Sequence, residues 1–254
     1  LGKVTAQTGT KFWFAAPEVT SGNSDQPILL RISSYDVPAL VTISQPANTN
    51  FTQRSVNVGV NQMATIDLTS DIFQVENSPV NTVLNYGLLI VSTESVSVYY
   101  EVKSNDYNTE IFNLKADKAL GVNFVIPGQT SFSNDTSFSP QAYATVDIVA
   151  TEDNTQIIFN PNGNLIYIPQ SPYSTRGTLV INLDKGEAYS LRGADGGAGV
   201  PSGKLEGSLV PIAITLKDDS NGDSGYGICS DLLGDQLLPM SQIGTEYIIV
   251  KGFL

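Results

Sequence analysis

The chain has 254 residues, of which 41% are apolar and 15% are charged, and this composition predicts a folded protein of one large domain or two small ones. Its net charge is −12, and its arginines are scattered at positions 31, 54, 176 and 192, so the sequence offers no basic surface for nucleic acid. It contains no histidine. Ser-His-Asp and Cys-His catalysis and the common two-histidine metal sites are therefore excluded.

Three features bear on the cellular compartment. Cys229 stands alone and cannot form an internal disulfide, so it is interpreted as an inert core or turn residue. No uncharged apolar run reaches the ~18 residues of a spanning helix, so no membrane span is predicted in this segment. Residues 1–6 end in Val4-Thr-Ala6, which is typical of a signal-peptide remnant, with an ordinary ragged terminus as the alternative. The expected location is secreted or at the outer cell surface.

Short segments rich in β-branched residues follow one another along the chain, and several alternate with a period of two residues. The predicted strands span residues 28–35, 39–44, 55–59, 95–102, 144–150, 156–159, 178–183 and 211–216. Turn formers such as Ser21-Gly-Asn-Ser24 and Asn160-Pro-Asn-Gly163 separate them. Only residues 228–243 carry leucines at a spacing that favours one or two helical turns. This pattern predicts an all-β fold of antiparallel β-sandwiches.

The sequence also repeats itself. Three Gly-x-x-aromatic motifs begin at Gly9, Gly121 and Gly244, which are 112 and 123 residues apart. Between them other features recur in the same order, and residues 96–105 align without gaps on residues 212–221. A conserved order of features favours duplication. We therefore predict two tandem antiparallel β-sandwich domains, residues 7–114 and 115–254, with residues 244–254 either starting a further unit or closing the second one.

Parts of the second unit resemble a known family. Lys115-Ala-Asp-Lys-Ala-Leu-Gly-Val-Asn-Phe-Val-Ile126, Val149-Ala-Thr-Glu-Asp-Asn-Thr155 and Gly207-Ser-Leu-Val-Pro-Ile-Ala-Ile-Thr215 are similar to the N-terminal domain of the IgG Fc-binding protein family. The first unit departs from this pattern at Ser33-Ser-Tyr-Asp-Val-Pro38. The resemblance is closest to bacterial members, and it implies a large, multi-domain cell-surface protein, in some cases linked to gliding or adhesion. It brings no catalytic residues with it.

One cluster of oxygen ligands follows the last predicted strand. Asp219, Asn221 and Asp223 alternate as in the first half of a calcium loop, although no glutamate stands at the twelfth position. A solvated turn explains the same residues, because Asp and Asn side chains satisfy their own backbone. The matching segment of the first unit, residues 103–106, lacks most of these carboxylates. Calcium is thus the one cofactor that the sequence suggests, and only in the second unit.

Three other patterns bear on chemistry or binding. Carboxylate pairs hydrolyse glycosides without histidine, and the candidates are Glu94, Glu101, Glu110, Glu152, Glu187 and Glu206. Among the aromatic residues, Trp13 is expected to point away from Phe12 and Phe14 and to pack in a core or against the neighbouring domain. An exposed ring there would instead stack on sugar. The glycine-rich residues 193–204 miss the spacing of a phosphate loop and predict a hairpin loop.

Two functions follow from these patterns. The favoured one is a non-enzymatic extracellular or cell-surface module of a larger bacterial protein, which serves in adhesion or binds a protein or glycan. The alternative is a secreted carbohydrate-active domain that binds glycans or hydrolyses them through carboxylates. Immunoglobulin binding is implied by the family resemblance alone. The sequence predicts no oligomeric state.

Overall fold

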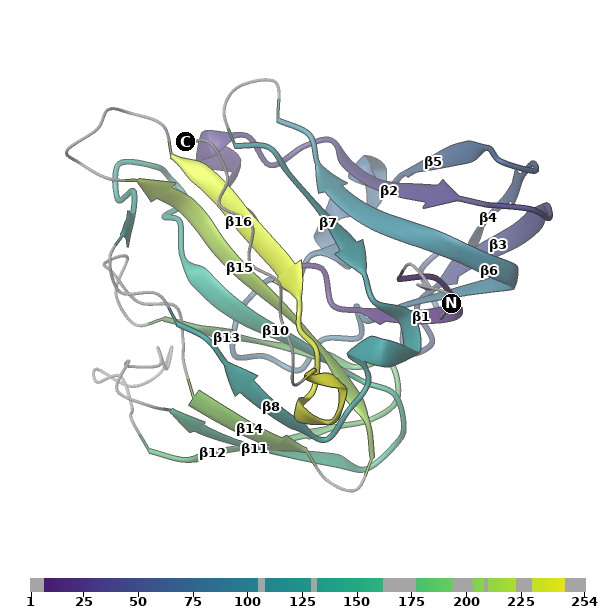
Figure 1. The fold of residues 1–254 in the computed structure, drawn as a ribbon. Coiled ribbons are helices and arrows are strands. Elements are labelled where there is room, and N and C mark those ends of the chain that lie inside the picture. The colour runs from purple at the N-terminus through teal and green to yellow at the C-terminus, as the bar shows by residue number, and fades with distance from the viewer. Residues whose placement is uncertain are drawn as a thin grey trace.

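The computed structural model describes residues 7–104, 108–128, 132–161, 177–193, 203–207, 210–222 and 230–244. Across these residues the chain is all-β, with antiparallel sheets and one short α-helix, α1 (Ile72–Val75). Figure 1 shows two lobes that pack side by side, an N-terminal lobe built from β1–β7 and a C-terminal lobe built from β8–β16. In the described part of the chain, no helix has the length and apolarity to cross a membrane.

The N-terminal lobe is organised around one long strand. Its strands are β1 (Gly9–Phe14), β2 (Ile28–Ser33), β3 (Ala39–Ser44), β4 (Arg54–Val58), β5 (Met63–Asp67), β6 (Leu88–Val102) and β7 (Glu110–Leu114), with 3-10 helices η1 (Ser21–Asn23) and η2 (Thr69–Asp71). The first half of β6 pairs with β1 and β3, and the second half pairs with β2 and β7. This gives two layers of strand order β1-β6-β3-β4 and β7-β6-β2-β5.

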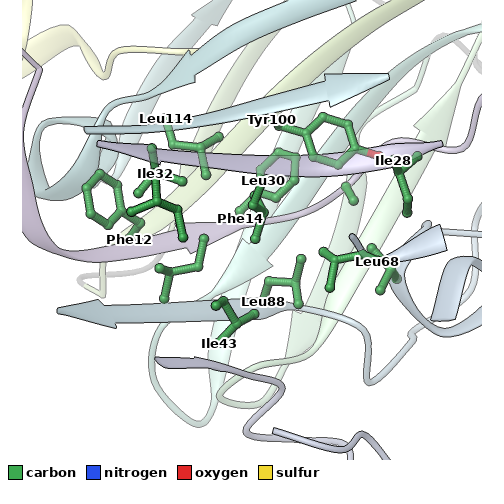
Figure 2. Close-up of a cluster of buried hydrophobic side chains, with 14 of the residues drawn as sticks. Phe12, Phe14, Ile28, Leu30, Ile32, Ile43, Leu68, Leu88, Tyr100 and Leu114 are labelled. Carbon is green, nitrogen blue, oxygen red and sulfur yellow. The ribbon is translucent and has the colours of Figure 1, made fainter. Parts of the chain in front are cut away.

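Alternating apolar side chains of the two layers form one core between them. Phe12, Phe14 and Leu88 come from one layer, and Leu30 and Ile32 come from the other (Figure 2). All are buried, because every second residue of a strand points to the same side of its sheet. Each such side chain contributes about 1.5–3 kcal/mol when it leaves water, so this core is the main source of the lobe's stability.

The C-terminal lobe has its own core between two layers. Its strands are β8 (Asn123–Ile126), β9 (Ser133–Asn134), β10 (Ala144–Ala150), β11 (Thr155–Pro161), β12 (Leu179–Leu183), β13 (Ala188–Arg192), β14 (Gly203–Gly207), β15 (Ile212–Gly222) and β16 (Asp231–Gln236), with 3-10 helices η3 (Ala116–Ala119) and η4 (Met240–Gln242). The layers have strand orders β8-β14-β11-β12 and β16-β15-β10-β13, and β9 adds to β15. Phe124, Phe159 and Ile214 lie in the core.

The two lobes share one strand order. β8, β14, β11 and β12 follow the order of β1, β6, β3 and β4, and β16, β15, β10 and β13 follow that of β7, β6, β2 and β5. The register agrees as well, since Gly9 faces Val96 as Gly121 faces Ile212, and Tyr100 faces Phe112 as Leu216 faces Asp235. Residues that hold the same place in the two lobes are called counterparts below.

Most predicted strands are confirmed, and residues 144–150 coincide with β10. The prediction of helical turns within residues 228–243 is wrong for the segment that contains Leu232 and Leu233. Leu232 and Leu233 belong to β16, where alternation buries Leu232 in the N-terminal core and leaves Leu233 exposed. Only η4 provides a helical turn. Cys229 and Tyr247 lie outside the described residues.

A third apolar cluster joins the lobes. Trp13 packs there against Val149, Ala188 and Ala213 of the C-terminal lobe, and only 1% of its surface is exposed. This confirms the expectation that Trp13 points away from Phe12 and Phe14, and of the two surroundings expected for it, a core or a neighbouring unit, the ring takes the contact with the other lobe. Hydrogen bonds reinforce the contact, because the Gln236 side chain donates to the Trp13 carbonyl over 2.8 Å and accepts from the Lys115 N–H over 2.6 Å.

Candidate functional site

The residues proposed for calcium lie at the junction of the lobes. Asp219 is buried in β15, and its carboxylate accepts hydrogen bonds from the Thr20 N–H at 2.7 Å, from Ser220 Oγ at 2.9 Å and from Asn108 Nδ2 at 3.4 Å. Asn221 is also buried and donates to Asp218 Oδ2 over 2.8 Å. Asp223 lies outside the described residues. Asp219 therefore ties the lobes together, whatever else it binds.

The calcium hypothesis stays a prediction. The described residues contain no group of three His, Cys, Asp or Glu that could hold a metal, but Asp223 is not among them. If the loop holds calcium, an excess of about 100 Kd should stabilise the fold by about 2.7 kcal/mol, because the ion binds the folded state alone. Thermal unfolding with calcium, with magnesium and with a chelator measures this. Equal melting temperatures in all three would remove calcium from consideration.

A second polar cluster, which sequence reasoning missed, is buried where β10 and β15 face the N-terminal lobe. Asp147 of β10 accepts from Thr145 Oγ1 at 2.7 Å and from Asn77 Nδ2 at 3.4 Å. Lys217 of β15 is buried beside it, and its Nζ lies 3.8 Å from Asp219 Oδ2. The available signal was Asp147 in the middle of the apolar strand β10, since charged residues are rarely buried without a partner. Lys217 gave a weaker signal, because polar residues follow it in β15.

The burial of this cluster changes its protonation. Burial raises the pKa of Asp147 from 3.8 to about 6, although the hydrogen bond from Thr145 and the charge of Lys217 work in the opposite direction. Burial also raises the pKa of Glu76 well above its usual value, and the nearby carboxylates of Asp25 and Glu18 add to the rise. Perturbed carboxylates are found at active sites and in structural networks alike. Here both side chains are enclosed between the lobes, which indicates a structural role.

The C-terminal lobe carries an open pocket beside the edge strands β8 and β16. It has a volume of about 380 Å³ and a mostly apolar lining, and we call it the β8–β16 pocket. Its walls come from the end of β8 and from the neighbouring strands β15 and β16: Pro127, Gly128, Leu216, Lys217, Asp218, Leu233, Gly234 and Asp235. The size and apolar character are those of a binding site for a small ligand or a protruding side chain.

The N-terminal lobe shows why this space is open. Its three rings Phe14, Tyr100 and Phe112 fill the same place, with ring centroids 4.8 Å apart for Phe14 and Tyr100 and 5.7 Å apart for Tyr100 and Phe112. Their counterparts in the C-terminal lobe are Ile126, Leu216 and Asp235. Smaller side chains thus replace a packed aromatic cluster, and the difference in volume leaves the β8–β16 pocket.

The groups predicted for glycan chemistry are scattered. Glu101 pairs with Arg31 at 2.5 Å, Glu187 accepts from the Asp184 N–H, and Glu94 and Glu152 are exposed on β6 and before β11. Glu110 lies on β7, and Glu206 is in β14, where its side chain is not described. None of these glutamates lines the β8–β16 pocket. Trp13 is buried, so its ring is not free to stack on sugar.

Comparison with known proteins identifies one family. The sequence model described as IgGFc binding protein matches residues 112–253, which cover the last three residues of β7 and run through β8–β16 and η4. No curated protein and no solved structure matches the chain.

Proposed function

Because this chain belongs to the IgGFc binding protein family, we propose that it is a non-enzymatic binding module of an extracellular protein and that its ligand is a protein. The family match carries the proposal, since it covers more than half of the chain. The sequence has no histidine, which supports a binding role over a catalytic one. The enclosure of Asp147 and Glu76 between the lobes supports it too, because a substrate needs access to its acid or base.

We further propose that residues 7–114 and 115–254 are tandem β-sandwich domains that arose by duplication. The shared strand order and the shared register support this, since two unrelated sandwiches have no reason to agree in both. The chain runs from β16 through η4 to Gly244 as it runs from β7 through η3 to Gly121. That parallel supports a further unit beginning within residues 244–254.

The wider setting is also a proposal. The family resemblance points to a bacterial protein that is secreted or held at the outer cell surface, where it serves in adhesion. The Val-x-Ala end of residues 1–6 supports export, because signal peptidases cleave after such small residues. A glycan in place of a protein ligand belongs to the alternative function of a carbohydrate-active domain.

Binding to immunoglobulin is the direct test. We expect the folded chain to bind immobilised Fc saturably, with a Kd at or below about 10 μM, and to leave the Fab fragment of the same antibody unbound. Biolayer interferometry measures both, with thermally unfolded chain as the control for non-specific adsorption. No Fc signal at a chain concentration of about 100 μM would rule out this ligand.

A glycan array combined with a hydrolysis screen tests the alternative. The binding proposal predicts no turnover of any glycoside. Turnover that disappears when one exposed carboxylate is replaced, for example in Glu94→Gln or Glu152→Gln, would overturn the non-enzymatic proposal, because a retaining or inverting glycosidase depends on each of its two acids.

A further inference from the structure

The lobes meet through two different surfaces, an edge of the N-terminal lobe and a sheet face of the C-terminal lobe. Because the lobes share one strand order, each lobe has both an equivalent edge and an equivalent face. The N-terminal lobe offers its β1 and β7 edge, where Trp13 and Phe112 lie. The C-terminal lobe covers this edge with the outer side of its β16-β15-β10-β13 sheet. Ala188 and Ala213 pack against Trp13, and a Cβ added to Gly234 would come within 2.8 Å of the Phe112 ring. Large side chains of one lobe thus meet small side chains of the other.

The corresponding edge of the C-terminal lobe carries exposed side chains. Val125 is the counterpart of Trp13, and 55% of its surface is exposed. Asp235 is the counterpart of Phe112, and it lines the β8–β16 pocket beside Leu233, which is 51% exposed. Where the N-terminal edge carries large rings, the C-terminal edge carries smaller side chains and a hollow.

The corresponding outer surface of the N-terminal lobe also carries exposed side chains. The outer side of its β7-β6-β2-β5 sheet, which we call the N-terminal outer face, carries Met63, Tyr99 and Ile111 together with the Arg31–Glu101 ion pair. Met63 is the counterpart of Ala188 and is 60% exposed, and Ile111 is the counterpart of Gly234 and is 50% exposed. At these positions the C-terminal sheet carries the small residues Ala188 and Gly234, whereas the N-terminal outer face carries large apolar side chains that protrude from it.

We propose that the β8–β16 pocket binds the N-terminal outer face of a second copy of this chain, in the arrangement that the two lobes already show within one chain. The sizes at two positions fit this occupant. Trp13 contacts Ala188 within one chain, and their counterparts Val125 and Met63 would meet between two copies. In the same way Phe112 lies against Gly234 within one chain, and their counterparts Asp235 and Ile111 would meet between two copies. In both pairs the large partner and the small partner exchange sides, so the total volume at the contact is kept, which is the condition for close packing.

The contact is head to tail, so it does not close on itself as a two-fold dimer does. One copy's C-terminal edge meets the next copy's N-terminal face, and each added copy presents a free edge again. Repetition of the step from lobe to lobe gives a chain of lobes in which each contacts its neighbours, as in repeat proteins. This assembly is separate from the proposed Fc ligand, so either can fail without affecting the other.

Cysteine cross-linking tests the proposed contact in the full chain. In a Cys229→Ser background, Met63→Cys combined with Val125→Cys should give a ladder of dimers, trimers and larger products with a short bismaleimide, because β5 and β8 lie on different lobes and the two cysteines meet only between copies. Each single variant should give dimers at most, because a ladder needs two reactive sites on every copy. Met63→Cys combined with Val180→Cys is the matched control, since Val180 is 57% exposed but lies on β12, away from the pocket.

Sedimentation of the unmodified chain gives a second readout. The weight-average mass should rise with concentration between about 10 μM and about 1 mM, and Met63→Glu or Leu233→Asp should abolish the rise while the far-UV circular dichroism stays unchanged. A chain that stays monomeric throughout, with no more ladder from the 63/125 pair than from the 63/180 pair, would overturn the proposal. A following unit of the same fold would then be the better candidate for the pocket.

Discussion

Replacing Trp13 by alanine should lower the free energy of unfolding by about 3–5 kcal/mol, the usual cost of deleting a buried aromatic side chain from a close-packed site. Trp13 fills the space between the lobes, where it packs against Val149, Ala188 and Ala213. Its indole Nε1 is buried and has no hydrogen-bond partner among the described residues, so the substitution removes packing and leaves no acceptor unpaired. The cost therefore reports how much the contact between the lobes contributes to stability.

Urea unfolding followed by far-UV circular dichroism measures this cost. Fluorescence is unsuitable because Trp13 is the only tryptophan in the sequence. Trp13→Phe keeps a six-membered ring and loses the unpaired N–H, so it should cost clearly less than Trp13→Ala, because it leaves a smaller cavity. Phe73→Ala is the surface control, since Phe73 is 90% exposed. A loss below about 1 kcal/mol for Trp13→Ala would mean that the lobes are stable without their contact.

The behaviour of Trp13 was predictable from the sequence, whereas its partners were not. Phe12, Trp13 and Phe14 are consecutive, so strand alternation sends Trp13 away from the core that its neighbours fill. Ala188 and Ala213 are more than 170 residues away in the chain, and no local pattern links them to it. Alternation identifies which side of a strand is buried. It carries no information about which distant sheet covers the other side.

The same limit explains the buried charges and the pocket. Asp147 interrupts an apolar strand, which marks it as unusual, but its partner Asn77 comes from the other lobe. The β8–β16 pocket has no sequence motif at all. It becomes visible only when Leu216 and Asp235 are set beside their counterparts Tyr100 and Phe112, and that comparison needs the strand register. The repeat in the sequence pointed to this comparison without supplying the register.

Asp147→Asn should stabilise the protein at neutral pH and leave it nearly unchanged in acid. The pKa of Asp147 is about 6 in the folded protein against 3.8 in the unfolded chain, so the folded state holds its proton over a wider pH range. The free energy of unfolding therefore falls as pH rises through this window, by about 3 kcal/mol in all, at 1.36 kcal/mol for each pKa unit. Asparagine does not ionise, and its Oδ1 still accepts from Thr145, so the variant avoids this loss.

Urea unfolding of wild type and Asp147→Asn at pH 4, 5, 6, 7 and 8 measures the effect. The difference in free energy between the two proteins should grow in favour of the variant up to about pH 6 and then level off. Glu76 also has a raised pKa, but it is present in both proteins, so its contribution cancels in the difference. Lys217 keeps Asp219 as a neighbouring charge in the variant.

Asp67→Asn supplies a control of opposite sign. The hydrogen bonds that Asp67 accepts from Thr69 lower the pKa of its carboxyl, so this group stabilises the fold above pH 3.8 and loses that effect as pH falls. As pH rises, the free energy of unfolding of Asp67→Asn should therefore fall relative to that of wild type, whereas that of Asp147→Asn should rise relative to wild type. If Asp147→Asn instead destabilised the protein at pH 8, the Asp147–Lys217 attraction would outweigh the cost of burying the two charges. The junction would then be an ion pair that holds the lobes together, as some buried pairs do.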